Sequence, residues 1–130
     1  MDGQFTFHEG HDHLHFDGYA EYALRVKTEA GTPGDVVATG GKVSFCLLDI
    51  EKYDPSAASS SYNTCDADRQ GVSAGWTDVY DSSLPDQYVN VASVPDGFYF
   101  LEVTVDPDNQ IIESDETNNV TTIELSLIHI

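Results

Sequence analysis

The sequence predicts an all-β protein, and the expected architecture is an Ig-like β-sandwich with long active-site loops. Short runs rich in β-branched and aromatic residues recur along the chain, turn residues separate them, and no segment has a helical period. The 130 residues are enough for one domain with a sizeable core. Short strands joined by such turns are typical of a β-sandwich.

In the first half of the chain we expect three strands and one long loop. Residues 19–27 read as a strand that ends at the Gly-Thr-Pro-Gly cluster 31–34. Residues 36–39 and 42–48 read as two further strands on either side of a Gly-Gly turn. Residues 54–75 are rich in Ser, Asp, Ala and Gly and lack a strong period, which predicts a long functional loop.

In the second half we expect strands at residues 87–92 and 98–105, on either side of a Pro-Asp-Gly turn. From Tyr99 onward every second residue of the latter strand is apolar, which is the pattern of a strand with one buried face. A turn at 106–109 precedes the last strand, which covers residues 119–124.

The six residues 125–130 continue an apolar strand but end without a turn. They are also the translation of a common sequencing-library transposon end. We therefore expect a domain at residues 1–124, incomplete at both ends, and an adaptor-derived tail at 125–130. A native apolar strand is the alternative, and in both cases we do not expect His129 in a metal site.

The charge of the chain excludes one class of partner. Lys plus Arg number 5 against 23 Asp plus Glu, giving a formal net charge of −18. Nucleic acid is therefore not an expected partner, because phosphate binding needs basic patches. We interpret the acidity as halophilic adaptation, with steering of cationic substrates as the alternative. No apolar run approaches the ~20 residues of a membrane span.

Cys46 and Cys65 form a pair that can close a disulfide bond. Neither belongs to a CxxC motif, so a redox motif or a zinc knuckle is not indicated. A disulfide would place the protein outside the cell or at the cell surface. Two unpaired buried thiols in a cytosolic protein are the alternative.

The segment His8-Glu9-Gly10-His11-Asp12-His13-Leu14-His15 predicts a metal site. On a β-strand His11, His13 and His15 project from one face, about 6–7 Å apart, and a twist or bulge lets them converge on one ion. Nitrogen ligands without cysteine favour copper or zinc. His8 faces the other way unless Gly10 marks a bulge. The alternative is an exposed His-rich stretch or tag with adventitious metal affinity.

Four ordered motifs resemble the catalytic domain of the lysyl oxidase family, the copper-dependent protein-lysine amine oxidases. The first three are the histidine segment, the segment 41–47 (Gly-Lys-Val-Ser-Phe-Cys-Leu) and the segment 71–80. The fourth consists of residues 94–99 together with residues 113–119, which follow later in the chain. The similarity runs from about His8 to Val120. The chain is identified as a member of this family, of a prokaryotic type and truncated to a fragment, with its catalytic domain at 1–124.

The resemblance implies a cofactor and the residues that make it. His11, His13 and His15 would hold copper, which with O2 would oxidise Tyr80, and the Lys42 amine would then attack to give lysine tyrosylquinone. That attack needs a neutral amine, whereas the pKa of free lysine is about 10.4 and must be lowered by desolvation. Otherwise Lys42 is a solvent-facing strand residue and Tyr80 an ordinary half-buried aromatic.

The resemblance also implies the reaction. Primary amines or protein lysine side chains would be converted to aldehydes with O2, releasing hydrogen peroxide and ammonia. Animal members of the family carry a histidine where Glu21 aligns here, and we assign no general base.

A second ligand set is expected near the C-terminus. Glu113, Asp115, Asn118 and Asn119 offer the hard oxygen ligands that calcium prefers. In the family the matching segment binds a structural calcium, with a further ligand from a segment upstream of the histidines. A polar turn with Asx caps is the alternative.

Two function classes follow from these motifs. The first is the copper and quinone-dependent amine oxidase. The second is a non-catalytic, metal-binding Ig-like adhesion module, because the Glu-Ser-Asp-Glu-Thr-Asn-Asn pattern also occurs in such modules. The oxidase needs Lys42 and Tyr80 within covalent reach of each other, and the module does not. A zinc hydrolase is a more distant third class.

Overall fold

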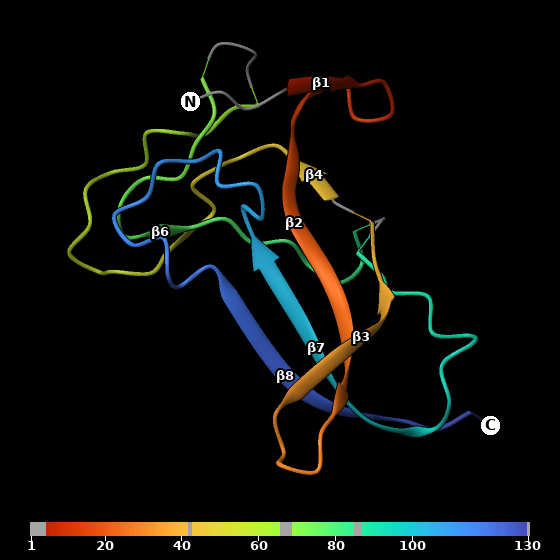
Figure 1. Cartoon of the computed structure of the whole chain (residues 1–130). Helices are drawn as coiled ribbons and strands as arrows, with labels where there is room; N and C mark the ends of the chain where they lie inside the picture. The colour runs from red at the N-terminus through yellow and green to blue at the C-terminus, as the bar shows by residue number, and fades with distance from the viewer. Residues whose placement is uncertain (1–4, 42, 66–68, 85–86, 130) are drawn as a thin grey trace. The chain divides into compact units, whose positions relative to one another are not determined.

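The computed structural model describes residues 5–41, 43–65, 69–84 and 87–129 (Figure 1). Across these ranges there is no helix, and every strand pairing with a described register is antiparallel. The all-β class is therefore confirmed, whereas the packing of two sheets face to face stays a prediction. None of the described segments is a helix long and apolar enough to cross a membrane.

The chain divides into two compact units. The sheet unit contains segments 18–43 and 86–130, and the histidine unit contains segments 3–17 and 44–85. The long strand β2 (His13–Lys27) gives its first residues to the histidine unit and the rest to the sheet unit.

In the sheet unit β2, β7 (Gly97–Val105) and β8 (Val120–Leu127) lie side by side (Figure 1). Leu101 of β7 stands opposite Leu24 of β2 and Ile123 of β8. A further strand of this unit, β3 (Pro33–Thr39), pairs with the C-terminal part of β2. β7 is thus paired on both sides, which confirms the strand predicted at 98–105.

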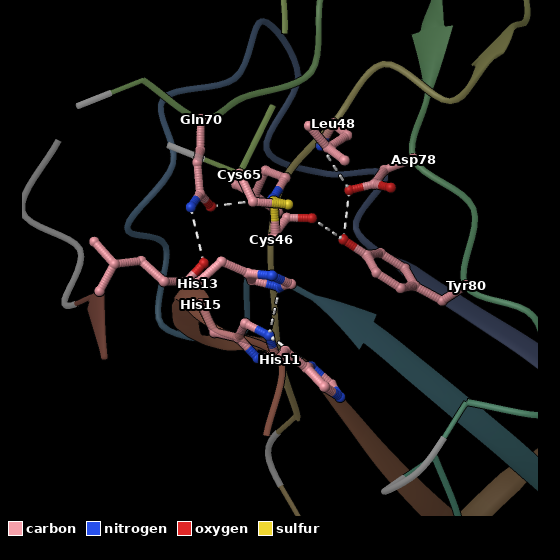
Figure 2. The surroundings of a disulfide bond; sticks show 11 residues. His11, His13, His15, Cys46, Leu48, Cys65, Gln70, Asp78 and Tyr80 are labelled. Atoms are coloured by element: carbon pink, nitrogen blue, oxygen red, sulfur yellow. Dashed lines mark hydrogen bonds between the residues drawn. A yellow bond between two sulfur atoms is a disulfide. The ribbon is translucent and has the colours of Figure 1, made fainter. Parts of the chain in front are cut away.

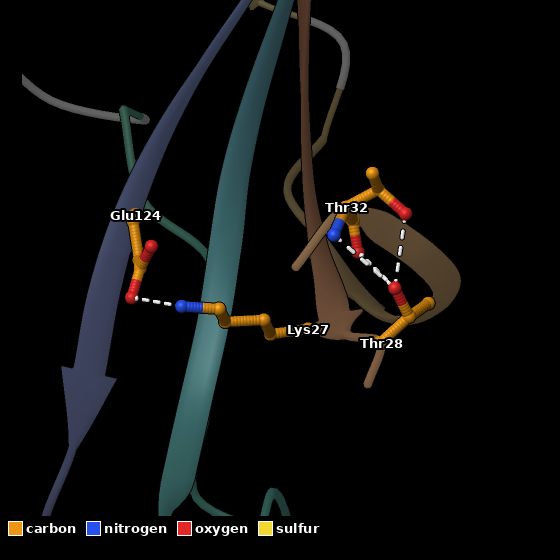
Figure 3. Close-up of polar contacts among 4 residues, drawn as sticks. All are labelled: Lys27, Thr28, Thr32 and Glu124. Atoms are coloured by element: carbon orange, nitrogen blue, oxygen red, sulfur yellow. Dashed lines mark hydrogen bonds and ion pairs between the residues drawn. The ribbon is translucent and has the colours of Figure 1, made fainter. Parts of the chain in front are cut away.

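The hairpin between β2 and β3 is closed by side chains (Figure 3). The Thr28 hydroxyl accepts a hydrogen bond from the Thr32 amide at 3.1 Å and donates to the Thr32 carbonyl at 3.0 Å. At the end of β2, Lys27 Nζ lies 2.6 Å from Glu124 Oε1 of β8. Both partners of this ion pair are partly exposed, so it stabilises the sheet little.

The core of the sheet unit includes side chains from a segment that was predicted to be a strand. Leu24, Val94 and Tyr99 are buried together, and Val89, Val91, Leu125 and Leu127 are among the side chains that pack against them. The prediction of a strand at 87–92 is wrong, because residues 87–92 have no strand pairing. The two valines of this segment instead reach the core from irregular backbone.

The histidine unit begins with β1 (Phe5–His8), which forms a hairpin with the start of β2. Within the hairpin Phe16 stands opposite Phe5, is fully buried and makes an edge-to-face contact with the Phe5 ring. Farther along, β5 (Glu51–Lys52) pairs with β6 (Trp76–Thr77). The described residues between these two strands form no strand, which agrees with the loop predicted at 54–75.

The strand predicted at 42–48 is mostly wrong, because β4 covers only Val43–Phe45. β4 pairs with β2. After β4 the backbone amides donate hydrogen bonds to side chains. The Leu47 amide donates to Gln70 Oε1 at 3.2 Å, and the Leu48 amide donates to Asp78 Oδ2 at 3.0 Å. These hydrogen bonds satisfy two backbone amides that a neighbouring strand would otherwise satisfy.

Candidate active site

A tight turn brings the histidines together. After His8 ends β1, the amides of His11 and Asp12 both donate to the His8 carbonyl, at 3.0 and 2.9 Å. Asp12 adopts a φ of 57°, a left-handed conformation that aspartate tolerates. β2 then begins at His13, directly opposite His8 in the hairpin register.

This hairpin corrects two expectations for the histidine segment. His11 lies on the turn, so the strand alternation invoked for His11, His13 and His15 applies only to the last two. His8 was expected on the opposite face, but its ring stacks on His11 at 4.3 Å and on His15 at 4.8 Å between centroids. The turn brings all four imidazoles into one cluster.

The ring nitrogens of the cluster are spaced as metal ligands would be (Figure 2). His15 Nε2 lies 3.1 Å from His11 Nδ1 and 3.1 Å from His13 Nε2. Nitrogens bound to one ion at about 2.0–2.1 Å lie roughly 2.9–3.4 Å apart in square or tetrahedral geometry. The described donor set therefore fits a copper or zinc ion. His8 offers a further nitrogen within 4.8 Å of those of His11 and His15.

The surroundings of His15 favour its neutral, ligating form. The ring is buried, and burial is the main cause that lowers its pKa, followed by the neighbouring imidazoles of His13, His8 and His11. Because metals bind the neutral imidazole, this environment reduces the competition from protons.

The predicted disulfide is confirmed. Cys46 and Cys65 are joined with a Cα–Cα distance of 5.6 Å. A ring nitrogen of His13 lies within 4.8 Å of both sulfur atoms. Since the sulfurs are bonded to each other, they are not thiolate ligands in this structure. The disulfide connects the loop to the residue that directly follows β4 (Figure 2).

Tyr80 is held by three contacts in the histidine unit. Its half-buried ring stacks on Phe45 at 3.7 Å between centroids. Its hydroxyl oxygen lies 2.6 Å from the Cys46 carbonyl and 2.5 Å from Asp78 Oδ2. The backbone carbonyl of Cys46 thus contacts Tyr80, and the sulfur of Cys46 lies near the His13 ring (Figure 2).

Gln70 connects the histidine strand with the segment that carries Cys46. Its side-chain oxygen accepts from the Leu47 amide at 3.2 Å, and its nitrogen donates to the Leu14 carbonyl at 2.8 Å. Leu14 lies between His13 and His15, so this bridge fixes the backbone that carries two of the imidazoles.

Lys42, the other expected cofactor residue, lies outside the described residues. Its distance from Tyr80 stays a prediction. Glu21 lies on β2 opposite Thr104 in the sheet unit.

Sequence reasoning missed Asp49, which organises the loop. This buried carboxylate accepts from the amides of Ser61, Tyr62 and Ser73 and from the Ser73 hydroxyl, at 2.6–3.1 Å. These bonds overcome the effect of burial and lower the pKa of Asp49 to about 2. Nothing distinguishes Asp49 from the other acids in the sequence, because its partners are three backbone amides and one serine hydroxyl that folding brings to it.

The expected calcium ligands lie on the segment before β8, where Asp115 and Asn118 are exposed and Glu113 and Asn119 are half-buried. Asp115 accepts from the Thr117 amide and hydroxyl at 2.9 and 2.6 Å, which is an Asx cap. Glu113 Oε2 accepts from Asn119 Nδ2 at 2.6 Å. These contacts suit the polar-turn alternative, and calcium binding by Glu113, Asp115, Asn118 and Asn119 stays a prediction.

Comparison with known proteins gives consistent matches. The chain matches the family described as lysyl oxidase over residues 1–129. It is 34% identical to lysyl oxidase homolog 3A of Danio rerio over 116 residues, 88% of this chain and 15% of that protein. Lysyl oxidase homolog 3 of Homo sapiens is also 34% identical over 116 residues, and lysyl oxidase homolog 2A of Danio rerio is 33% identical over 117 residues.

The chain therefore spans about 15% of the length of these relatives. Nothing in the matches supports a prokaryotic subgroup.

Proposed function

The chain belongs to the lysyl oxidase family, and on that premise we propose that it carries the copper site and the cofactor residues of an amine oxidase. The reaction converts a primary amine, O2 and water to an aldehyde, ammonia and hydrogen peroxide. The substrates are primary amines or lysine side chains of proteins. The observation that carries the proposal is the convergence of three imidazoles in the same unit in which hydrogen bonds hold the Tyr80 hydroxyl.

We assign the metal ligands from this geometry. His15 is the central ligand, because its Nε2 faces a ring nitrogen of His11 and one of His13 at 3.1 Å. Burial lowers the pKa of His15 and so favours its neutral form, and the Gln70 bridge fixes the backbone at Leu14, between His13 and His15. Bound copper would supply, together with O2, the oxidising power for cofactor formation and turnover.

We assign the cofactor to Tyr80 and Lys42, joined as lysine tyrosylquinone. Phe45 and Cys46 hold the Tyr80 ring and hydroxyl in the histidine unit. The attack of Lys42 on the oxidised ring requires that its amine be neutral, and apolar Val43 and Phe45 follow it in the chain.

We place the protein outside the cell or at its surface, because the Cys46–Cys65 disulfide persists in oxidising compartments. Calcium at Glu113, Asp115, Asn118 and Asn119 is part of the same proposal. There the ion would replace the direct Glu113–Asn119 hydrogen bond.

Amine-dependent peroxide release tests the proposed activity. The copper-loaded, aerated chain should release hydrogen peroxide when a primary amine is added. Lys42→Arg keeps the charge but cannot supply a nucleophilic neutral amine, so it should bind copper equally well and release no peroxide. Lys52→Arg is the matched control, because Lys52 is exposed and bonds the Ala57 carbonyl. Full peroxide release by Lys42→Arg would show that Lys42 is not part of the cofactor. A parent chain that binds copper but releases no peroxide would favour the non-catalytic, metal-binding module.

A further inference from the structure

The Tyr80 hydroxyl has more close oxygen neighbours than it has protons. Its oxygen lies 2.6 Å from the Cys46 carbonyl oxygen and 2.5 Å from Asp78 Oδ2, and both distances are those of hydrogen bonds (Figure 2). A phenol carries one O–H donor. A carbonyl oxygen can only accept, so the contact with Cys46 uses the phenol proton.

The second contact therefore needs a proton from the other partner. An ionised carboxylate only accepts, whereas a protonated carboxyl donates one hydrogen bond. With Asp78 protonated, its O–H donates to Tyr80 and the Tyr80 O–H donates to Cys46, so all three oxygens are satisfied. With Asp78 ionised, two acceptors would compete for one proton at short distance.

The position of Asp78 suits a protonated carboxyl. It lies directly after β6 and is half-buried, and burial is the main cause that raises its pKa. The nearby carboxylate of Asp49 raises it further, whereas the Tyr80 hydroxyl and the Leu48 and Val79 amides act in the opposite direction. Among the residues that the structure describes, no cation is one of the groups that act on the Asp78 carboxyl.

We propose that Asp78 is a positioning residue for the cofactor tyrosine, and that it donates a hydrogen bond to the Tyr80 oxygen as a neutral carboxylic acid. Its role in the cofactor rests on the proposed function, but its protonation does not.

The proposal has a consequence for cofactor formation. The oxygen of an oxidised Tyr80 ring would have no proton and could only accept a hydrogen bond. The contact with the Cys46 carbonyl would then be lost, whereas the hydrogen bond from Asp78 would be kept. A neutral Asp78 can therefore hold this oxygen both before and after oxidation, which the Cys46 carbonyl cannot do.

Carbon-13 NMR of the aspartate carboxyls in the metal-free chain tests the protonation. At a pH at which the exposed Asp54 is fully ionised, the Asp78 carboxyl should still have the chemical shift of a protonated acid. Asp54 is a suitable internal reference, because hydrogen bonds from Ser56 lower its pKa. An Asp78 that ionises together with Asp54 would overturn the proposal whether or not the chain is an oxidase.

Two variants test the positioning role. Asp78→Asn keeps a neutral donor of similar shape, so it should form the quinone after copper addition, whereas Asp78→Ala should form it at least tenfold more slowly. At the high pH at which the Tyr80 phenol ionises, Asp78 in the parent chain has already lost its proton, so Asp78→Asn removes a carboxylate from beside the phenolate and should lower the pKa of Tyr80. Asp54→Asn should change neither property.

Copper binding shows whether each variant is folded, because Asp78 lies outside the histidine cluster. Normal quinone formation by a folded Asp78→Ala would refute the positioning role. If neither variant folds, the NMR measurement on the parent chain decides. A parent chain that forms no quinone would refute the proposed function, and the protonation of Asp78 would still be measured.

Discussion

Asp49→Asn should destabilise the histidine unit by an amount that depends on pH. The Asp49 carboxylate binds two separate parts of the loop, because it accepts from Ser61 and Tyr62 at one point and from Ser73 at another. The amide of asparagine keeps the shape but removes the charge. It also turns one acceptor atom into a donor, which would face backbone amides.

The size of the effect follows from the pKa of Asp49. Its carboxyl has a pKa of about 2 in the folded chain, against the ordinary value of 3.8. Each pKa unit corresponds to ~1.36 kcal/mol, so the ionised carboxyl stabilises the fold by about 2 kcal/mol. Because the folded pKa is the lower one, this stabilisation is present above pH 3.8 and is lost as the pH falls toward 2.

Urea unfolding of the parent chain and of Asp49→Asn, with the disulfide intact, measures this contribution. The difference in unfolding free energy should be about 2 kcal/mol at pH 7 and should shrink steadily below pH 4. Asp54→Asn, which removes an exposed carboxylate, should cost much less. A difference for Asp49→Asn that stayed constant between pH 7 and pH 2.5 would refute the electrostatic account.

Three further predictions follow from the structure. His15→Ala should abolish tight copper binding, measured by competition with a chelator, whereas His129→Ala should retain it, because His129 pairs with Asp96 outside the cluster. Replacing Cys46 and Cys65 by serine should lower the unfolding free energy by about 3 kcal/mol, from the loop that the disulfide closes, and no loss would contradict this. If the net charge of −18 reflects halophilic adaptation, the thermal midpoint should rise through molar potassium chloride, and a flat midpoint would favour substrate steering instead.

The sequence predicted those elements whose residue pattern reflects the local backbone conformation. The alternation at 98–105 identified β7 because this strand pairs on both sides and its side chains must alternate. The same reasoning failed at 87–92, where Val89 and Val91 also alternate but reach the core from irregular backbone. Spacing alone cannot tell these two cases apart, because strand pairing depends on partners that lie far away in the chain.

In the candidate site, too, the sequence predicted the local spacing of residues but not the contacts between distant segments. The spacing of the histidines indicated a metal site, but it could not show that a turn would bring His8 and His11 against His15. Asp49 and Asp78 act on backbone amides and on Tyr80 through contacts made by folding. In a chain with 23 acidic residues, nothing local distinguishes these two from the rest.

The measurement that tests the central claim most directly is a quinone stain of the purified chain after copper loading in air. The parent chain and Lys52→Arg should stain, whereas Lys42→Arg and Tyr80→Phe should bind copper and stay unstained. Digestion of the stained protein should give a covalently joined pair of peptides that contain Lys42 and Tyr80. A parent chain that binds copper through its histidines but never stains would contradict the account and leave a metal-binding module as the better description.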